Sequence, residues 1–133
     1  MSKIVCTIKS IKTHHSLNVF TLDFEGFELK MISLEIDEKI KNAKKVIVGV
    51  KPFAVGILKD FHGNISFSNR LKGYICDIDN GSLLSSIKIK IGKTELESVM
   101  LYQTAEDMKL RIKDEITAVI RASELYIVDV CDV

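Results

Sequence analysis

The sequence has no tryptophan, one proline and three cysteines among its 133 residues. The cysteines are Cys6, Cys76 and Cys131, an odd number with no CxxC pair, which argues against a disulfide framework or a zinc ribbon. We therefore expect reduced, mostly buried thiols. Neither sign of charge predominates, because the sequence has 19 basic and 18 acidic residues. A net charge of +1 gives no global field for nucleic acid or an anionic membrane.

Long apolar runs are absent too. No stretch approaches the roughly 18 apolar residues that a membrane-spanning helix requires. The segment Met1 to Thr7 lacks the apolar core and small-residue cleavage site of a secretory signal. These features predict a cytoplasmic protein that does not insert into membranes.

Alternating apolar residues dominate what is present. In residues 19–24 the apolar side chains Phe20, Leu22 and Phe24 share one strand face, and residues 87–91 repeat the pattern with isoleucines and lysines. Short strands are also expected at 46–50 and 116–120. Turns are expected at 25–26, 79–82 and 92–93, with Asn80-Gly81 the clearest hairpin signal because both residues tolerate positive φ. The sequence therefore predicts a mostly β fold.

Two segments break the alternation and predict short helices. Residues 104–110 begin with Thr104 as a candidate N-cap and carry acids in the first turn. Residues 34–40 are a candidate counterpart in the first half of the chain.

The two halves of the sequence resemble each other. Residues 11–29 align with 78–96 at a spacing of 67 positions, and residues 48–51 align with 118–121 at a spacing of 70. The polar stretch 60–64 is the best boundary. We therefore predict two repeats, 1–63 and 64–133. Repeats this small have little core of their own, which predicts a shared core or a homo-oligomer.

Two motifs in the second half resemble the Mop (TOBE) family. The segment Ser66-Phe67-Ser68-Asn69-Arg70-Leu71-Lys72-Gly73 is similar to the family's opening motif, Ser-Ala-Arg-Asn-x-Leu-Lys-Gly. The segment Ala118-Val119-Ile120-Arg121-Ala122-Ser123 is similar to its closing strand, Ala-Val-Ile-Lys-Ala-Ser/Thr. The resemblance covers about 66–130 and, more faintly, 3–59, so the first repeat is degenerate.

The resemblance implies a fold and a ligand. The fold is two OB-like five-stranded barrels in tandem, each with one short helix, which exchange strands. The ligand is molybdate or tungstate, bound as an oxyanion between domains by backbone N–H groups, hydroxyls and one basic side chain. The matching positions are Ser66, Phe67, Ser68 and Asn69 in the opening loop, Thr104 at the start of the expected helix, Arg121, Ala122 and Ser123 on the closing strand, and Lys51 in the first half.

Such a donor set suits a tetrahedral dianion, which has four acceptor oxygens and no donors. Backbone N–H groups and hydroxyls supply hydrogen bonds, and one Lys or Arg offsets part of the charge. A near-neutral protein can therefore bind this anion.

The sequence also departs from the family pattern. Ser68 replaces the motif arginine, Leu101 replaces a threonine before the helix, and Pro52 follows Lys51 and has no N–H to donate. Each lost donor costs about 1–3 kcal/mol of anion binding unless another group replaces it. These departures predict sites that are weaker, fewer or altered in selectivity compared with the family, and a first repeat that is mainly structural.

Simpler readings stand beside these. The serines of the opening loop also suit a strand start, and Arg121 suits a solvated strand face. His14, His15 and His62 have no ligand set around them and are read as surface residues. Asp77 and Asp79 flank a hairpin rather than forming a catalytic pair. The sequence predicts no catalytic residues, no bound metal except as the oxyanion, and no nucleic-acid surface, because stacking aromatics in a basic groove are not evident.

The predicted function is therefore non-enzymatic: binding of molybdate or tungstate for storage, buffering or homeostasis, with no organic cofactor. An alternative is a regulatory or assembly module with a weakened anion site, which binds a protein partner such as a transporter ATPase or a regulator.

Overall fold

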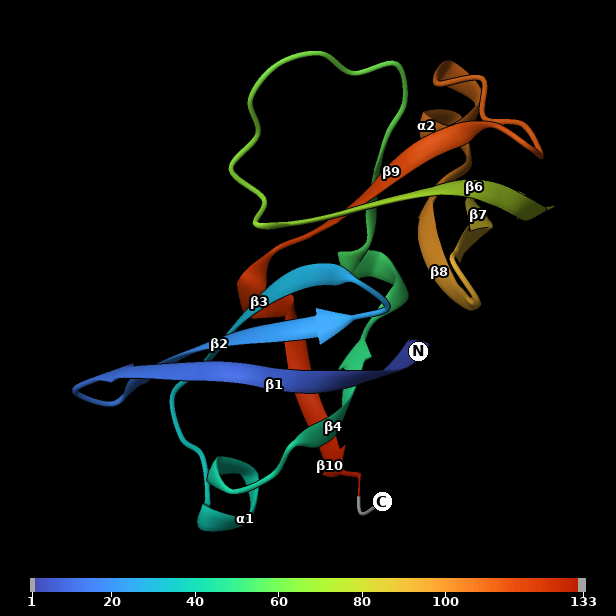
Figure 1. The fold of residues 1–133 in the computed structure, drawn as a ribbon. Coiled ribbons are helices and arrows are strands. Elements are labelled where there is room, and N and C mark those ends of the chain that lie inside the picture. Colours follow the sequence, from blue (N-terminus) through green and yellow to red (C-terminus); the bar gives the residue numbers. More distant parts are fainter. Residues whose placement is uncertain (1, 132–133) are drawn as a thin grey trace.

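The computed structural model describes residues 2–131 and consists of two five-stranded antiparallel sheets (Figure 1). The first half contributes β1 (Ser2–His14), β2 (Leu17–Phe24), β3 (Phe27–Ser33), α1 (Glu38–Lys41), β4 (Lys45–Val50), the 3-10 helix η1 (Pro52–Ala54) and β5 (Gly56–Leu58). The second half contributes β6 (Asn69–Asn80), β7 (Leu84–Ile91), β8 (Thr94–Leu101), α2 (Tyr102–Asp107), β9 (Glu115–Ile120), the 3-10 helix η2 (Ala122–Glu124) and β10 (Leu125–Val130).

Each half donates a strand to the other half's sheet. The first sheet has the order β10-β4-β1-β2-β3, and the second has the order β5-β9-β6-β7-β8. In both sheets the visiting strand pairs antiparallel with the strand that precedes a 3-10 helix. The mostly β tandem fold with a short helix in each half is thus as predicted, and it includes the implied strand exchange. The division into 1–63 and 64–133 stays a prediction.

The internal repeat is visible in the register of the strands. β2 and β7 lie 67 positions apart and bury the same alternate positions, from Asn18 and Ser85 to Phe24 and Ile91. β1 and β6 each carry a bulge, after Ile8 and after Ile75 respectively. β4 and η1 lie 70 positions before β9 and η2. The predicted repeat is therefore confirmed at the level of individual residues.

The core is apolar and shared by both halves. The predicted strand face of Phe20, Leu22 and Phe24 is buried, and so are the isoleucines at 87, 89 and 91. These side chains belong to one continuous cluster that spans both sheets. Burial of this alternating face accounts for the strand conformation, since a slip of one residue would expose all of these side chains.

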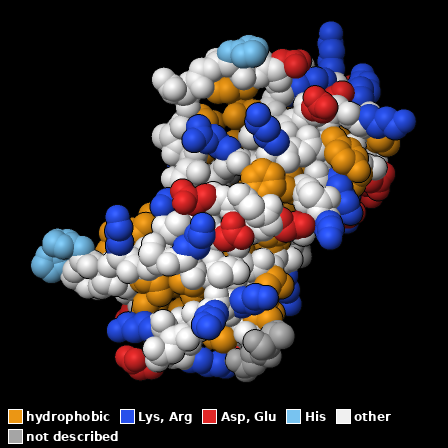
Figure 2. Space-filling model, in the orientation of Figure 1, with side chains coloured by type: hydrophobic (Ala, Val, Ile, Leu, Met, Phe, Trp, Pro, Cys, Tyr) orange, Lys and Arg blue, Asp and Glu red, His pale blue; other side chains and the backbone are white. Residues whose placement is uncertain are grey.

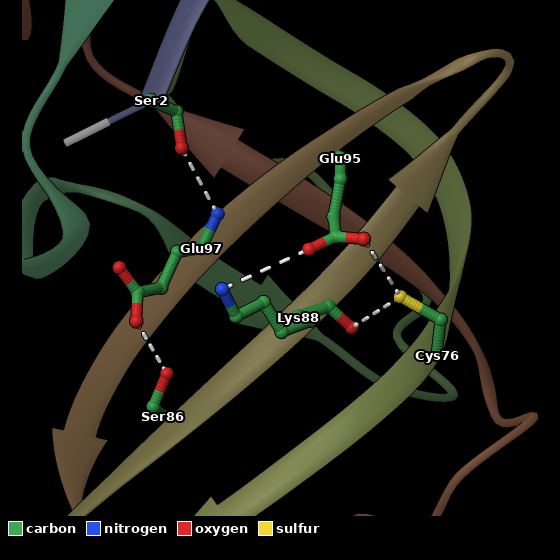
Figure 3. A network of polar contacts seen from close by, with 6 residues as sticks. All are labelled: Ser2, Cys76, Ser86, Lys88, Glu95 and Glu97. Atoms are coloured by element: carbon green, nitrogen blue, oxygen red, sulfur yellow. Dashed lines mark hydrogen bonds and ion pairs between the residues drawn. The ribbon is translucent and has the colours of Figure 1, made fainter.

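Hydrogen bonds in equivalent positions join the halves. Asn69 at the start of β6 bonds to the backbone of Lys30 on β3, and Ser2 at the start of β1 accepts a hydrogen bond from the N–H of Glu97 on β8. Figure 3 shows the second contact, where Glu97 also accepts a hydrogen bond of 2.5 Å from the Ser86 hydroxyl. The start of each repeat is therefore fastened to the edge strand of the other.

Three local expectations were wrong. The helix α2 begins at Tyr102 after Leu101, so Thr104 lies inside it and is not the N-cap. The Asn80-Gly81 hairpin exists, but neither residue has positive φ, because the connection contains three residues closed by the Gly81 N–H to Leu84 carbonyl bond. Of the three free cysteines only Cys6 is buried, and the others are half-buried.

Candidate functional site

The opening and closing motifs meet because of strand register. Asn69 at the start of β6 pairs with Ile120 at the end of β9. In an antiparallel pair, the residues before Asn69 and those after Ile120 then leave the sheet side by side. Ser68 and Arg121 are therefore brought together although 52 residues separate them in the sequence.

The Arg121 side chain lies on an aromatic ring of the opening loop. Its guanidinium carbon is 4.1 Å from the centroid of the Phe67 ring. A cation over a ring face at this distance is attracted by the ring's quadrupole, with about 0.5–1 kcal/mol at an exposed site. Phe67 therefore restrains the orientation of an exposed arginine.

A small hollow opens beside this pair. Its volume is about 220 Å³. This space is below the roughly 300–1,000 Å³ of typical organic-ligand pockets and well above the roughly 30 Å³ share of one water molecule. The hollow is lined by Lys51, Phe53, Ala54, Phe67, Arg121 and Glu124. It thus has the size for a small ion and its hydration water.

The lining follows the internal repeat. Lys51 precedes η1 as Arg121 precedes η2, and Ala54 is equivalent to Glu124. The hollow therefore lies where the two halves of the molecule meet, between equivalent elements. Two cations face one carboxylate, Glu124, which leaves a local excess of one positive charge. This excess is modest and favours an anion.

Donors are distributed unequally between the two 3-10 helices. In η2 the first internal bond runs from the N–H of Glu124 to the carbonyl of Arg121, so the N–H groups of Ala122 and Ser123 lie outside the turn's own pattern. In η1 the equivalent of Ala122 is Pro52, which has no N–H. The second repeat therefore offers more N–H donors next to the hollow, although Ala122 and Ser123 do not themselves line it.

The remaining predicted residues have varied positions. Ser66 and Ser68 are exposed and flank Phe67, and Ser123 is exposed in η2. Asn69 is fully buried, and its carbonyl and amide groups already bond to Lys30. Thr104 is exposed on α2, which packs against β7 and β8 and contributes nothing to the hollow. The structure brings the opening loop, Arg121 and Lys51 together and leaves Thr104 apart.

Sequence reasoning missed three residues of the hollow, Phe53, Ala54 and Glu124. Phe53 follows the proline of η1, and its side chain is 71% exposed. The repeat carried a usable signal, since Ala54 and Glu124 each lie three residues after the equivalent cations Lys51 and Arg121. Among residues 2–131, no group of three or more His, Cys, Asp or Glu side chains is placed to hold a metal ion. No helix in that range has the length and hydropathy to span a membrane.

The sequence matches no protein-family model and has no significant match among curated proteins. Among solved structures, the fold is similar to that of ModG, a cytoplasmic molybdate-binding protein whose crystal structure contains molybdate. The TM-score is 0.89 at 21% identity, over 97% of this chain and 95% of that one. A molybdate-binding protein from Sporomusa ovata matches 45% of this chain and 90% of its own length, at 27% identity and a TM-score of 0.44. The likeness to ModG shows that the chain has the two-domain fold of that protein.

Proposed function

We propose that this protein binds molybdate or tungstate as an oxyanion and serves in the cytoplasm to store or buffer it, without catalysis. The contact between Arg121 and Phe67 carries the proposal, because it joins the opening and closing motifs beside a hollow that is large enough for a small ion. The proposed ligands are the Arg121 guanidinium, the N–H groups of Ala122 and Ser123, and the hydroxyls of Ser66, Ser68 and Ser123.

The likeness to ModG supports the choice of anion. ModG has the same fold over nearly its whole length and binds molybdate. The charge of the hollow is compatible with this ligand, since a single excess positive charge offsets part of a dianion's charge and neutral donors can bond its oxygens.

Calorimetric titration of the full chain with molybdate, tungstate and sulfate tests the proposal. We expect both metal oxyanions to bind at sub-millimolar concentration, and more tightly than sulfate. Arg121→Ala and Ser123→Ala should each weaken binding at least tenfold, which corresponds to about 1.4 kcal/mol. Arg111→Ala is the matched control, since Arg111 lines no part of the hollow. An absence of heat with both metal oxyanions would refute the proposal.

Thr104 and Lys51 receive separate tests. Lys51 lines the hollow, so Lys51→Gln should weaken binding. Thr104 lies away from it, so an effect of Thr104→Ala would require a second copy of the chain at the site. Self-association into a homo-oligomer is part of the proposal, and light scattering at micromolar concentration measures it; a stable monomer would contradict it.

An exposed apolar surface favours a second candidate function, the binding of a protein partner. Leu84 pairs with Leu101 across β7 and β8, and Leu83 accepts a hydrogen bond from the Tyr102 N–H beside them. Leu83 is 76% exposed and Leu101 is 60% exposed. In this function the anion site is weak, and the partner is a transporter ATPase or a regulator. A pull-down from cell extract with and without molybdate, comparing Leu83→Ser/Leu101→Ser with the unmodified chain, distinguishes the two.

A further inference from the structure

The linker between the repeats encloses a second, larger cavity. After β5 ends at Leu58, residues 59–68 form neither helix nor strand and return to the second sheet at β6. Figure 1 shows this green segment as a wide arch beside β9 and β6, and Figure 2 shows the cavity beneath it. The cavity has a volume of about 1000 Å³. This value lies at the upper end of the range for small-molecule sites.

The arch is fastened at its first residue. The Lys59 ammonium group lies 2.9 Å from the Asp114 carboxylate and donates a 2.7 Å hydrogen bond to the Lys109 carbonyl. At its other end, the linker continues into Asn69, which is buried and bonded to Lys30. Both ends of the linker are therefore held, and the cavity is a built part of the fold.

The floor of the cavity is the outer face of the second sheet. Arg70, Lys72 and Tyr74 occupy successive outward positions of β6, roughly 6.6 Å apart at strand spacing, and all three line the cavity. Across the register, Thr117 lies opposite Lys72, and Glu115 lies opposite Tyr74. The floor thus runs from two cations to an aromatic ring.

The roof and walls add one more ring and one more cation. Phe61 and His62 line the cavity from the arch, and Lys113 lines it from the segment before β9. Phe61 and Tyr74 are each 46% exposed, so both rings have free surface. Arg70, Lys72 and Lys113 form no ion pair within residues 2–131, whereas the only lining carboxylates are those of Asp60 and Glu115. The cavity therefore combines exposed aromatic surface with an excess of positive charge.

We propose that this cavity binds a small organic anion in which a planar aromatic ring is joined to a phosphate group, as in a nucleotide. The ring stacks against Tyr74 and Phe61, a contact that tolerates any flat aromatic system. The phosphate accepts hydrogen bonds from Arg70, whose planar guanidinium suits phosphate oxygens, and from Lys72. This site is separate from the proposed oxyanion site and does not depend on it, since the two share no lining residue.

The first repeat provides an internal comparison. Lys3, Val5 and Thr7 occupy the positions equivalent to Arg70, Lys72 and Tyr74, on β1. These residues line no comparable cavity in the described chain. The proposed site is therefore a property of the second repeat, and Lys3 is a matched control for Arg70.

The test is a titration of the full chain, without molybdate, by calorimetry and by amide NMR shifts. The probes are adenosine monophosphate, flavin mononucleotide, pyridoxal phosphate, adenosine and inorganic phosphate. At least one ring-bearing phosphate should bind ten or more times more tightly than adenosine and than inorganic phosphate. The order of affinity among the three ring-bearing phosphates identifies which kind of ring the cavity prefers: adenine, flavin or pyridine.

Variants then locate the site. Arg70→Gln and Tyr74→Leu should each weaken binding of the best probe at least tenfold, while Lys3→Gln and Arg121→Ala should leave it unchanged. Both floor residues are exposed, and circular dichroism verifies that the variants fold. The proposal is overturned if every ring-bearing phosphate binds no better than inorganic phosphate, if both floor variants bind normally, or if a short oligoadenylate binds more tightly than adenosine monophosphate. Retained nucleotide binding with no molybdate binding would remove only the function proposed above.

Discussion

The Asn69 side-chain amide makes the two backbone hydrogen bonds to Lys30 that a neighbouring strand would otherwise make. The Lys30 N–H donates to Oδ1 of Asn69 at 2.7 Å, and Nδ2 of Asn69 donates to the Lys30 carbonyl at 2.9 Å. Lys30 lies on β3, the last strand of the first sheet, where backbone groups would otherwise lack a strand partner. One side chain therefore satisfies a donor and an acceptor of the other repeat, and it does so while fully buried.

Removing this amide should destabilise the protein strongly. Asn69→Ala leaves two backbone groups of Lys30 without a partner, and each buried unpaired group costs about 1–3 kcal/mol. We expect a loss of roughly 2–4 kcal/mol in the free energy of unfolding, measured by urea denaturation. Ser2→Ala is the matched control, because the equivalent Ser2 satisfies only the Glu97 N–H and should cost about 1 kcal/mol. Equal losses in the two variants would show that the amide does not have this role.

The sequence was sufficient to predict the alternating strands and the repeat, because both depend on local spacing. Phe20, Leu22 and Phe24 face the core as their period of two requires. The repeat spacing of 70 positions correctly paired Lys51 with Arg121. The resemblance of the second repeat to a known family then supplied the tandem fold.

What the sequence did not reveal depends on contacts between distant residues. Asn69 stands in the opening motif, where its ligand role stays a prediction, yet its amide bonds to a residue 39 positions away. The Thr104 cap was wrong because the Tyr102 N–H bonds to the Leu83 carbonyl in a neighbouring turn, which fixes an earlier helix start. No local pattern encodes either partner.

The ring beneath Arg121 should matter for anion binding. Phe67→Leu removes the surface that restrains the guanidinium, so we expect affinity for molybdate to fall about two- to fivefold, in line with about 0.5–1 kcal/mol for an exposed cation over a ring. Phe67→Tyr keeps the ring and should bind almost normally. Calorimetry on both variants provides the measurement, and unchanged affinity in the leucine variant would assign Phe67 no part in the site.

Removing the carboxylate in the hollow should strengthen anion binding, whereas the other variants weaken it. Glu124 lines the same hollow as Arg121 and opposes a dianion. Glu124→Gln removes this repulsion while keeping the size of the side chain, so molybdate should bind several times more tightly, most clearly at low salt. Glu106→Gln on α2 is the control, because Glu106 lies outside the hollow. Weaker binding in the Glu124 variant would place the anion elsewhere.

The thiol of Cys6 should be inert in the native protein. Burial raises its pKa to about 12, and the nearby Asp23 carboxylate adds to the shift. A thiol with a raised pKa favours the fold below its unfolded pKa of about 8.5, and this contribution is lost as pH rises toward 12. Labelling with a thiol reagent at pH 8, followed by peptide mass spectrometry, should modify Cys131 and leave Cys6 unlabelled until denaturant is added. Equal labelling of the two without denaturant would contradict this burial.

The ion pair at the start of the linker should control how tightly the arch is held. A hydrogen bond from Lys59, followed by one from the Arg111 N–H, lowers the pKa of Asp114 below its ordinary value. A lowered pKa means that the contact is complete above about pH 3.9 and is lost as pH falls through the folded-state pKa. Asp114→Asn removes the charge at any pH and should therefore reproduce the acid effect at neutral pH.

Chymotrypsin cleavage beside the exposed Phe61 reports on this anchor. We expect Asp114→Asn to be cut several times faster at pH 7, with little change in global stability, because opening of the linker rather than unfolding limits the rate. Asp129→Asn is the control, since its ion pair with Lys39 is 3.7 Å long and about 60% exposed on both sides, and such pairs contribute little. The Lys59 and Asp114 side chains are only 22% and 24% exposed, so their pair is screened less. Identical cleavage rates in the two variants would mean that the arch is held by its other end alone, at Asn69.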